Sequence, residues 1–174
     1  MVNDKKLEEL LLNLQAGKES AFEQIYRMTD QSVFAYLLSI IRNRDTAQDL
    51  MQDAYLKIRS NIHSYQPQGK PLAWIFTICR NLALGEIRRI NRTTQQAADP
   101  SQKLLESGYE EHLIEGLVLR STLSLLGSID RQILLLHVIS GMKHREIALF
   151  LQLPLGTVLW RYNRAIKILR IHLA

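Results

Sequence analysis

The polar residues best suited to chemistry lie on one side of a segment near the C-terminal end of the 174-residue chain. On a helical wheel at about 100° per residue, Trp160, Asn163, Arg164, Lys167 and Arg170 share one face. An Asn side chain pairs with the edge of adenine and an Arg side chain with that of guanine, while further cations hold phosphates. This combination predicts contacts with duplex DNA; the alternative is an ordinary helix surface with a basic stripe.

The same segment follows a helix-turn-helix pattern. Residues 143–170 read KHREIALFLQLPLGTVLWRYNRAIKILR, with the small Ala148 where two helices would touch. Apolar contacts around the turn are expected from Ile147, Leu151, Leu153 and Val158. The second helix would place its basic face in a major groove and bury an apolar face made of Leu155, Val158, Leu159, Tyr162, Ala165, Ile166, Leu169 and Leu173.

The duplex contacts expected from this second helix come from six residues: Thr157, Trp160, Arg161, Asn163, Arg164 and Lys167. Three interpretations of Trp160 stay open, because its ring suits a thymine methyl group, a partner protein or its own domain.

A second candidate surface lies in the segment 71–92. Its expected apolar face consists of Leu72, Ile75, Phe76, Cys79, Leu82, Ala83, Ile87 and Ile90. Arg80, Asn81 and Arg88 lie opposite, with Trp74 at the border and Tyr65 in the preceding loop. Aromatic rings beside cations suit unstacked bases, because a ring stacks on a base while cations hold phosphates. The alternative assigns Trp74 to the core, where Cys79 is also expected as an inert thiol.

A row of carboxylates precedes this surface. Asp45, Asp49 and Asp53 repeat at one-turn spacing, so they form either a solvated stripe or a docking face for a basic partner. Carboxylates on a single helix, without His or further oxygen ligands, are a weak metal signal. We therefore expect no metal site and no cofactor.

Helices must position all of these residues, and helical spacing recurs almost throughout the chain. The first expected helix is short, ends at Gly17 and contains Leu7, Leu10, Leu11 and Leu14. The second runs from a Ser20–Glu23 capping box to about Ile41. The third is capped by Asp45 and ends near Ser60, and the fourth runs from Pro71 to about Arg92. Helices resume near Tyr109, with breaks at 127–128, 141 and 153–154. The predicted fold is all-α, with small helical domains at 1–92 and 109–174, the latter a helix-turn-helix domain, joined by a flexible linker at 93–108.

Composition agrees with helices and an anionic partner. Only 8 residues are Gly, and Leu and Ile far outnumber Val, which favours helices over a sheet. The formal net charge is +5, yet residues 54–92 and 131–174 each carry seven basic and one acidic side chain. Two separated basic segments predict two contacts with a polyanion. The single Cys excludes an internal disulfide framework, and without a signal peptide or a span of about 20 apolar residues we expect a cytoplasmic protein.

Four runs of residues, in this order, carry a family pattern: Ala21-Phe22, DTAQDLMQDAYLKI, PLAWIFTICRNLALGEIRR and ILLLHVISGMKHREIALFLQLPLGTVLWRYNRA. Together they resemble the extracytoplasmic-function (ECF) sigma factors of bacterial RNA polymerase. The resemblance implies that the chain binds core RNA polymerase, recognises two promoter elements and helps to melt the DNA.

The resemblance also implies residue roles. Asp49, Gln52 and Asp53 would bind the polymerase clamp. The loop Tyr65–Lys70 would receive a flipped base of the downstream element, and Trp74, Arg80, Asn81 and Arg88 would line the DNA beside it. The second helix of the helix-turn-helix would read the upstream element, and the linker would lead toward the polymerase active-site channel. Many family members are restrained by an anti-sigma factor, but no feature of this sequence indicates such a partner.

Several positions depart from the family pattern. Leu159 and Trp160 stand where a basic residue and Ser are usual, Gly85 where an acidic residue is usual, Gly127 where Pro is common, and Gln152 where Gly is frequent. The promoter sequence is therefore not predicted.

Two other functions compete with the sigma-factor hypothesis. A stand-alone helix-turn-helix regulator would bind duplex DNA without polymerase. An enzyme is not expected, and neither is a small-molecule substrate. The five His residues are scattered, and the chain has no glycine-rich phosphate loop or nucleophile motif.

Overall fold

The computed structural model describes residues 2–96 and 125–173, without the side chains of 94–96 and 173. The chain divides into two units, Met1–Gly108 and Tyr109–Ala174. Every regular element in the described ranges is a helix, which confirms the all-α prediction. Residues 97–108 of the predicted linker, and the helix expected near Tyr109, lie outside the described residues.

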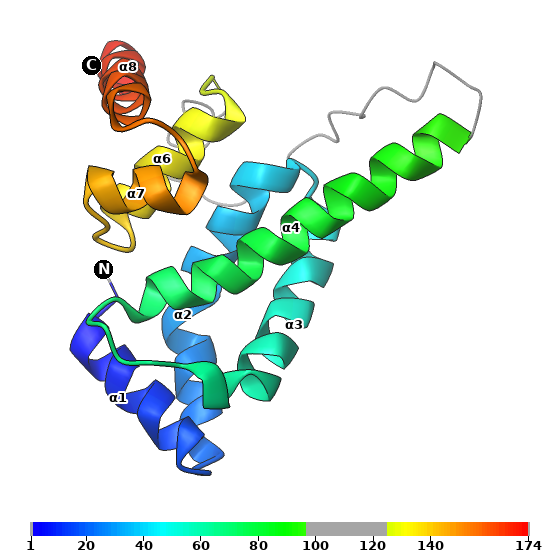
Figure 1. The fold of residues 1–174 in the computed structure, drawn as a ribbon, viewed down its shortest axis with the longest axis vertical. Coiled ribbons are helices and arrows are strands. Elements are labelled where there is room, and N and C mark those ends of the chain that lie inside the picture. The colour runs from blue at the N-terminus through cyan, green and yellow to red at the C-terminus, as the bar shows by residue number, and fades with distance from the viewer. Residues whose placement is uncertain (1, 97–124, 174) are drawn as a thin grey trace. The chain divides into compact units, whose positions relative to one another are not determined.

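The described part of the N-terminal unit consists of four α-helices and one short 3₁₀ turn (Figure 1): α1 (Asp4–Gln15), α2 (Ser20–Ile41), α3 (Arg44–Ser60), η1 (Ile62–Ser64) and α4 (Pro71–Gln96). Helix α2 packs against α1, α3 and α4, and α4 packs against α1 and α3 as well. The predicted leucine stripe of α1 is confirmed, since Leu7, Leu10, Leu11 and Leu14 are all buried. At the centre, the rings of Tyr36 and Phe76 stack with their centroids 4.4 Å apart.

The helix starts differ from prediction in two places. The Ser20–Glu23 capping box does not form, because α2 begins after Glu19, whose backbone is already helical and whose side chain makes no capping bond. Helix α3 is capped by Asn43 instead of Asp45: the Asn43 side chain accepts a hydrogen bond from the Thr46 N–H at 2.9 Å. Asp45 lies inside the first turn, where its charge favours the helix dipole.

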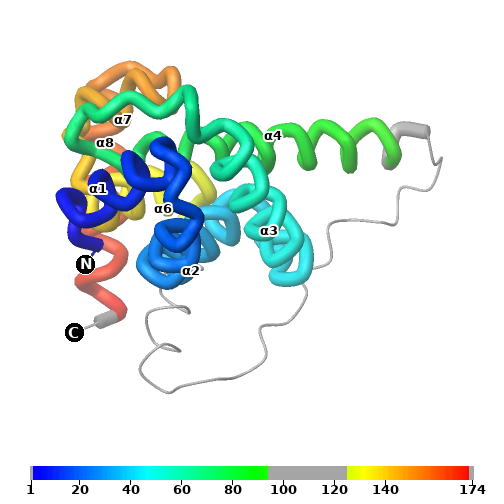
Figure 2. The backbone as a smooth tube through the Cα atoms, turned by 90° about the horizontal axis from the view of Figure 1, so that it is seen from below, coloured from blue at the N-terminus to red at the C-terminus, as the bar shows by residue number. Residues whose placement is uncertain are grey.

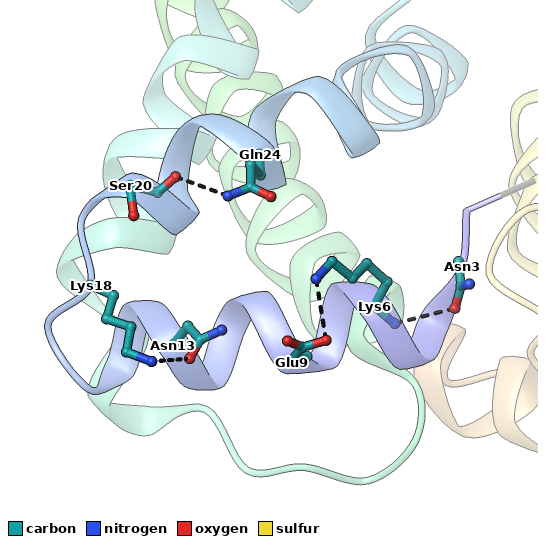
Figure 3. A network of polar contacts seen from close by, with 7 residues as sticks. All are labelled: Asn3, Lys6, Glu9, Asn13, Lys18, Ser20 and Gln24. Carbon is teal, nitrogen blue, oxygen red and sulfur yellow. Dashed lines mark hydrogen bonds and ion pairs between the residues drawn. The ribbon is translucent and has the colours of Figure 1, made fainter.

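Polar contacts line the outer faces of α1 and the start of α2 (Figure 3). Asn3 caps α1 by accepting a hydrogen bond from the Lys6 N–H at 3.2 Å, and the Lys6 ammonium pairs with Glu9 at 3.3 Å. The Lys18 ammonium donates to Asn13 across the turn between the two helices. These contacts are exposed, so they contribute little to stability.

Helix α4 is longer than predicted and projects beyond its neighbours. It continues past Arg92 to Gln96, and the Thr93 hydroxyl donates to the carbonyl of Arg89. Ala83 is its last fully buried residue among those with described side chains. Both views show its C-terminal half extending away from α1, α2 and α3 (Figures 1 and 2). Leu82, Ile87 and Ile90, expected in the core, are therefore only half-buried.

The described part of the C-terminal unit consists of α6 (Ser128–Val138), α7 (His144–Leu151) and α8 (Leu155–Leu173). The predicted breaks at 127–128, 141 and 153–154 are confirmed. Gln152, in the turn between α7 and α8, has a left-handed backbone with φ of 57°. A left-handed φ explains why glycine suits this position, since a side chain there costs conformational energy.

None of the helices within 2–96 and 125–173 combines the length and apolar character needed to cross a bilayer.

Candidate nucleic-acid and polymerase interfaces

Helix α8 presents the predicted polar face outward. Asn163, Arg164 and Lys167 are exposed, whereas Val158 and Ala165 on the opposite side are completely buried. The prediction that Leu159 is buried was wrong, because Leu159 is exposed, and Ile168 packs against the core cluster instead. Both residues lie at the margin of the apolar stripe, where a small rotation of the helix decides which one is covered.

Two arginines of α8 share one buried carboxylate of α6. Asp130 is only 2 % exposed, and its carboxylate accepts a hydrogen bond from Arg161 at 2.8 Å. The Arg164 guanidinium lies 3.9 Å from the other carboxylate oxygen, with its side chain half exposed. Arg161 therefore helps to hold α8 on α6, whereas Arg164 still faces solvent.

Trp160 lies on the exposed face of α8 and is 59 % exposed. The guanidinium of Arg164, one turn further along, lies 5.5 Å from the centroid of the Trp160 ring, a cation–π distance. Of the three interpretations of Trp160, the structure therefore excludes packing into the core of its own domain. Thr157, one turn before Arg161, is half-buried.

The helix-turn-helix seam forms as predicted. Ile147, Ala148 and Leu151 of α7 and Val158 of α8 are buried, and Leu153 in the turn is half-buried. The Lys143 N–H at the start of α7 bonds to the carboxylate of Glu146.

A cluster that the sequence did not reveal joins α6, α7 and α8. The rings of His137 and His144 stack 4.4 Å apart, and both rings contact Tyr162 edge-on. His137 donates from Nδ1 to the carbonyl of Met142, since a carbonyl oxygen can only accept. Burial, and then the proximity of His137, lower the pKa of His144. The two histidines are seven residues apart on different helices, so no local pattern predicts their contact.

On α4, the predicted polar residues lie on one side but differ in burial. Asn81 and Arg88 are exposed, while Trp74 and Arg80 are half-buried. Burial raises the pKa of the Tyr36 hydroxyl, and Arg80 opposes that shift, so the Arg80 charge lies near the core tyrosine. Cys79, on the opposite face, is buried, which raises the pKa of its thiol to about 12 and suppresses the thiolate at neutral pH.

Tyr65, whose ring was expected from the sequence to suit an unstacked base, is buried and anchors the loop before α4. Tyr65 is 3 % exposed, and its ring meets Trp74 edge-on with the centroids 5.1 Å apart. The Tyr65 hydroxyl donates to Glu8 of α1. Residues 66–69 are exposed and Lys70 is half-buried. The loop thus presents 66–69 to solvent while Tyr65 supports it from beneath.

Helix α3 places Asp49, Gln52 and Asp53 on an exposed face, as predicted. Leu56 extends this face and is 65 % exposed, a residue that the sequence analysis missed. Its position one turn after Gln52 and Asp53 is the helical spacing that could have revealed it. Leu56 therefore adds an exposed apolar side chain to the face formed by these polar residues. Within the described ranges, no group of three or more His, Cys, Asp or Glu side chains is arranged to hold a metal ion.

Comparison with known proteins matches each of the two units to a domain family. Sigma-70 region 2 matches residues 25–93, and Sigma-70 region 4 matches residues 117–169. The ECF RNA polymerase sigma factor EcfG of Rhodopseudomonas palustris is 35 % identical over 136 residues, covering 77 % of this chain and 75 % of that protein. The chain belongs to the ECF family of RNA polymerase sigma factors. This sigma factor is also 25 % identical to SigM of Bacillus subtilis, over 84 % of its own length and 93 % of that of SigM.

Solved structures agree with this assignment. The sigma factor RpoE of Bartonella quintana, solved with the anti-sigma factor NepR, aligns with a TM-score of 0.71 and 25 % identity over 87 % of this chain and 96 % of that one. CnrH, solved with the cytosolic domain of CnrY, aligns with a TM-score of 0.63 and 22 % identity over 97 % of both chains, a likeness of fold. The stand-alone regulator is therefore not favoured, and sigma factors are not enzymes in the catalytic sense.

Proposed function

We propose that this sigma factor binds core RNA polymerase through α3, opens the downstream promoter element with the 61–70 loop and α4, and reads the upstream element with α8. One observation carries the proposal: each unit presents outward a helix whose exposed face bears Asn and Arg side chains, Asn81 and Arg88 on α4 and Asn163 and Arg164 on α8. The holoenzyme acts in the cytoplasm, where the polymerase and its template are.

At the downstream element, the exposed tip of the loop receives an unstacked base. Unstacking costs a few kcal/mol, so the protein must supply compensating contacts. The backbone and side chains of 66–69 and Lys70 surround the base, with Tyr65 and Trp74 as the aromatic support below. Arg80, Asn81 and Arg88 hold the adjoining strand through phosphate and base-edge contacts.

At the upstream element, α8 enters the major groove. Arg164 and Asn163 pair with base edges, while Thr157 and Lys167 contact phosphates. Trp160 lies beside Arg164 and meets apolar base surface such as a thymine methyl. Arg161 contributes through its bond to Asp130, which holds the helix at the depth where these side chains reach the bases.

The polymerase contact is the exposed face of α3. Asp49, Gln52 and Asp53 pair with a basic surface, and Leu56 adds apolar contact area beside them. An anti-sigma factor is a further partner that we propose, because the Bartonella RpoE structure was solved with one. It would compete with polymerase or DNA for these faces.

The test is transcription by core polymerase with the purified full chain on a library of genomic promoter fragments. We expect promoter-dependent transcripts with wild type, and at least about a tenfold loss after Asp49→Lys with Asp53→Lys, which reverse the charge of the docking face. Glu23→Lys, an exposed reversal on α2, is the matched control and should leave transcription unchanged. A folded wild-type chain that yields no promoter-dependent transcript contradicts the proposal.

A further inference from the structure

Helix α1 reaches the loop between α3 and α4 through two polar side chains. The Gln15 amide nitrogen lies within hydrogen-bond distance of three carbonyl oxygens, those of Ile62 at 3.2 Å, His63 at 3.3 Å and Tyr65 at 3.1 Å. These carbonyls belong to η1 and the first part of the loop. One amide group from a distant part of the sequence thus organises the start of the loop.

Glu8, two turns before Gln15 on the same face of α1, holds the far part of the loop. A single carboxylate oxygen of Glu8 accepts hydrogen bonds from the Tyr65 hydroxyl at 3.1 Å and from the Gly69 backbone N–H at 3.0 Å. Burial, and then the bond to Glu8, raise the pKa of Tyr65, so its hydroxyl keeps the proton that it donates. Glu8 therefore connects the buried anchor of the loop to its exposed end.

Four of these five hydrogen bonds are to backbone atoms of the segment 61–70, so they act directly on its shape. Gly69 has a left-handed φ of 70°, and Pro67 has no backbone N–H to donate. The loop can therefore form few hydrogen bonds within itself. Ordering a free backbone costs about 1–2 kcal/mol per residue. A loop already held in one shape avoids that cost when a base arrives.

Charged side chains gather where α1 meets the end of the loop. Burial, and then the Glu8 charge, raise the pKa of Asp4, while Lys70 lowers it, so the two carboxylates and the ammonium group lie close together. Lys70 is the last residue of the proposed base-receiving loop. Side chains of α1 therefore contact the segment 61–70 at its beginning, at Tyr65 and near its end.

We propose that Glu8 and Gln15 are positioning residues that hold the 61–70 loop in the shape that receives the unstacked base, so that α1 controls promoter opening without touching DNA. The inference rests on the proposed function, because it takes from it the role of the loop. It assigns to the N-terminal helix a part in DNA melting that lies outside residues 25–93, the range matched by Sigma-70 region 2.

The experiment measures opening of the downstream element by the holoenzyme, on duplex promoter DNA and on the same promoter already melted at that element. We expect Glu8→Ala to lower opening of the duplex about tenfold, and Gln15→Ala to lower it by a similar factor, as the loss of two or three modest hydrogen bonds predicts. On pre-melted DNA the loss should fall to less than about twofold, because the energetic cost of unstacking has been removed.

Glu9→Ala is the matched control. Glu9 is the next residue of α1, and its exposed carboxylate pairs with the Lys6 ammonium at 3.3 Å (Figure 3). The holoenzyme with Glu9→Ala should open the duplex promoter to the same extent as wild type. Glu8→Gln should recover most of the opening, because its amide oxygen can accept both hydrogen bonds.

Equal opening by Glu8→Ala, Glu9→Ala and wild type would overturn the inference, as would an equal loss on pre-melted and duplex DNA or a failure of Glu8→Gln to recover opening. Binding of each variant to core polymerase confirms that the unit is folded. A wild-type holoenzyme that opens no promoter refutes the proposed function itself, whereas a wild type that opens promoter beside unaffected variants refutes only the role of α1.

Discussion

The two units hold their helices together by different means. The interior of the N-terminal unit is mainly apolar and aromatic, and the stacked Tyr36 and Phe76 are its largest completely buried side chains. The C-terminal unit keeps a buried carboxylate, Asp130, and the His137–His144 pair between its helices. A smaller unit buries a smaller share of its surface and has less apolar packing to rely on. Specific polar contacts then take a larger part in fixing its helices.

This difference affects how folding and DNA recognition are connected. In the N-terminal unit, the loop proposed to receive a base is held by Glu8 and Gln15, outside the apolar core. In the C-terminal unit, Arg161 and Arg164 of the proposed reading helix are the partners of the buried Asp130. Substitution of Glu8 or Gln15 should therefore affect function more than stability, whereas substitution of Arg161 should affect both.

The largest effect is expected from the apolar core. Phe76→Ala removes a completely buried ring and should cost about 3–5 kcal/mol, because the cavity left behind collapses only in part. Amide hydrogen exchange, followed separately for α2 with α4 and for α6 with α8, should show the loss in the first pair alone. An equal loss in both pairs would mean that the two units do not unfold independently.

The buried ion pair should come next. Arg161→Met leaves the Asp130 carboxylate without its 2.8 Å partner, and we expect a loss of about 2–3 kcal/mol in the C-terminal unit, below the fully buried case because Arg161 is a third exposed. Urea unfolding followed by signals of α6 and α8 measures it. Arg170→Met, an exposed change on the same helix, serves as control. If the two variants are equally stable, the ion pair does not hold α8.

Loss of a base contact should be smaller and should appear in specificity. Arg164→Ala is expected to reduce discrimination at one position of the upstream element by about 1–3 kcal/mol, the value of a bidentate base contact. Transcription from promoters that carry each base at every upstream position checks this. If the order of promoter strengths is the same for variant and wild type, Arg164 is not a reading residue.

Acid should weaken the C-terminal unit through its histidine pair. The pKa of His144 is lowered in the folded state, first by burial and then by His137, so the unfolded chain binds the proton more readily. Stability is complete above the unfolded value of about 6.5 and is lost as the pH falls from there through the folded pKa. Unfolding of α6 and α8 between pH 7.5 and 5 measures the effect, and His144→Phe should flatten the profile. A steeper profile in that variant would assign the pH dependence to other groups.

The smallest effect should come from the surface of the N-terminal unit. Arg59 pairs with Glu19 at 2.9 Å, but both side chains are more than half exposed. Arg59→Gln should therefore change stability by less than about 1 kcal/mol. A loss as large as that of Arg161→Met would show that burial is not what distinguishes the two ion pairs.

Helical periodicity predicted the elements and most of the buried faces. The leucines of α1 are buried where their spacing predicts, and so are the apolar residues predicted for α4 from Leu72 to Ala83, except the half-buried Leu82, because a core-facing helix buries a residue at every third or fourth position. The prediction was wrong at Leu159, which lies at the edge of its stripe. The buried place of Tyr65 was not predicted either, because the loop that contains it has no periodicity.

Local chemistry, by itself, determined the all-α class, the breaks between helices, the helix-turn-helix seam and the two outward basic faces, since each depends on residues within a few turns of one another. Tertiary structure alone decided that Glu8 and Gln15 meet a loop some fifty residues away, that Asp130 lies under α8 and that His137 stacks on His144. These contacts depend on how whole helices pack, and packing angle and rotation leave no trace in the spacing of residues along one helix.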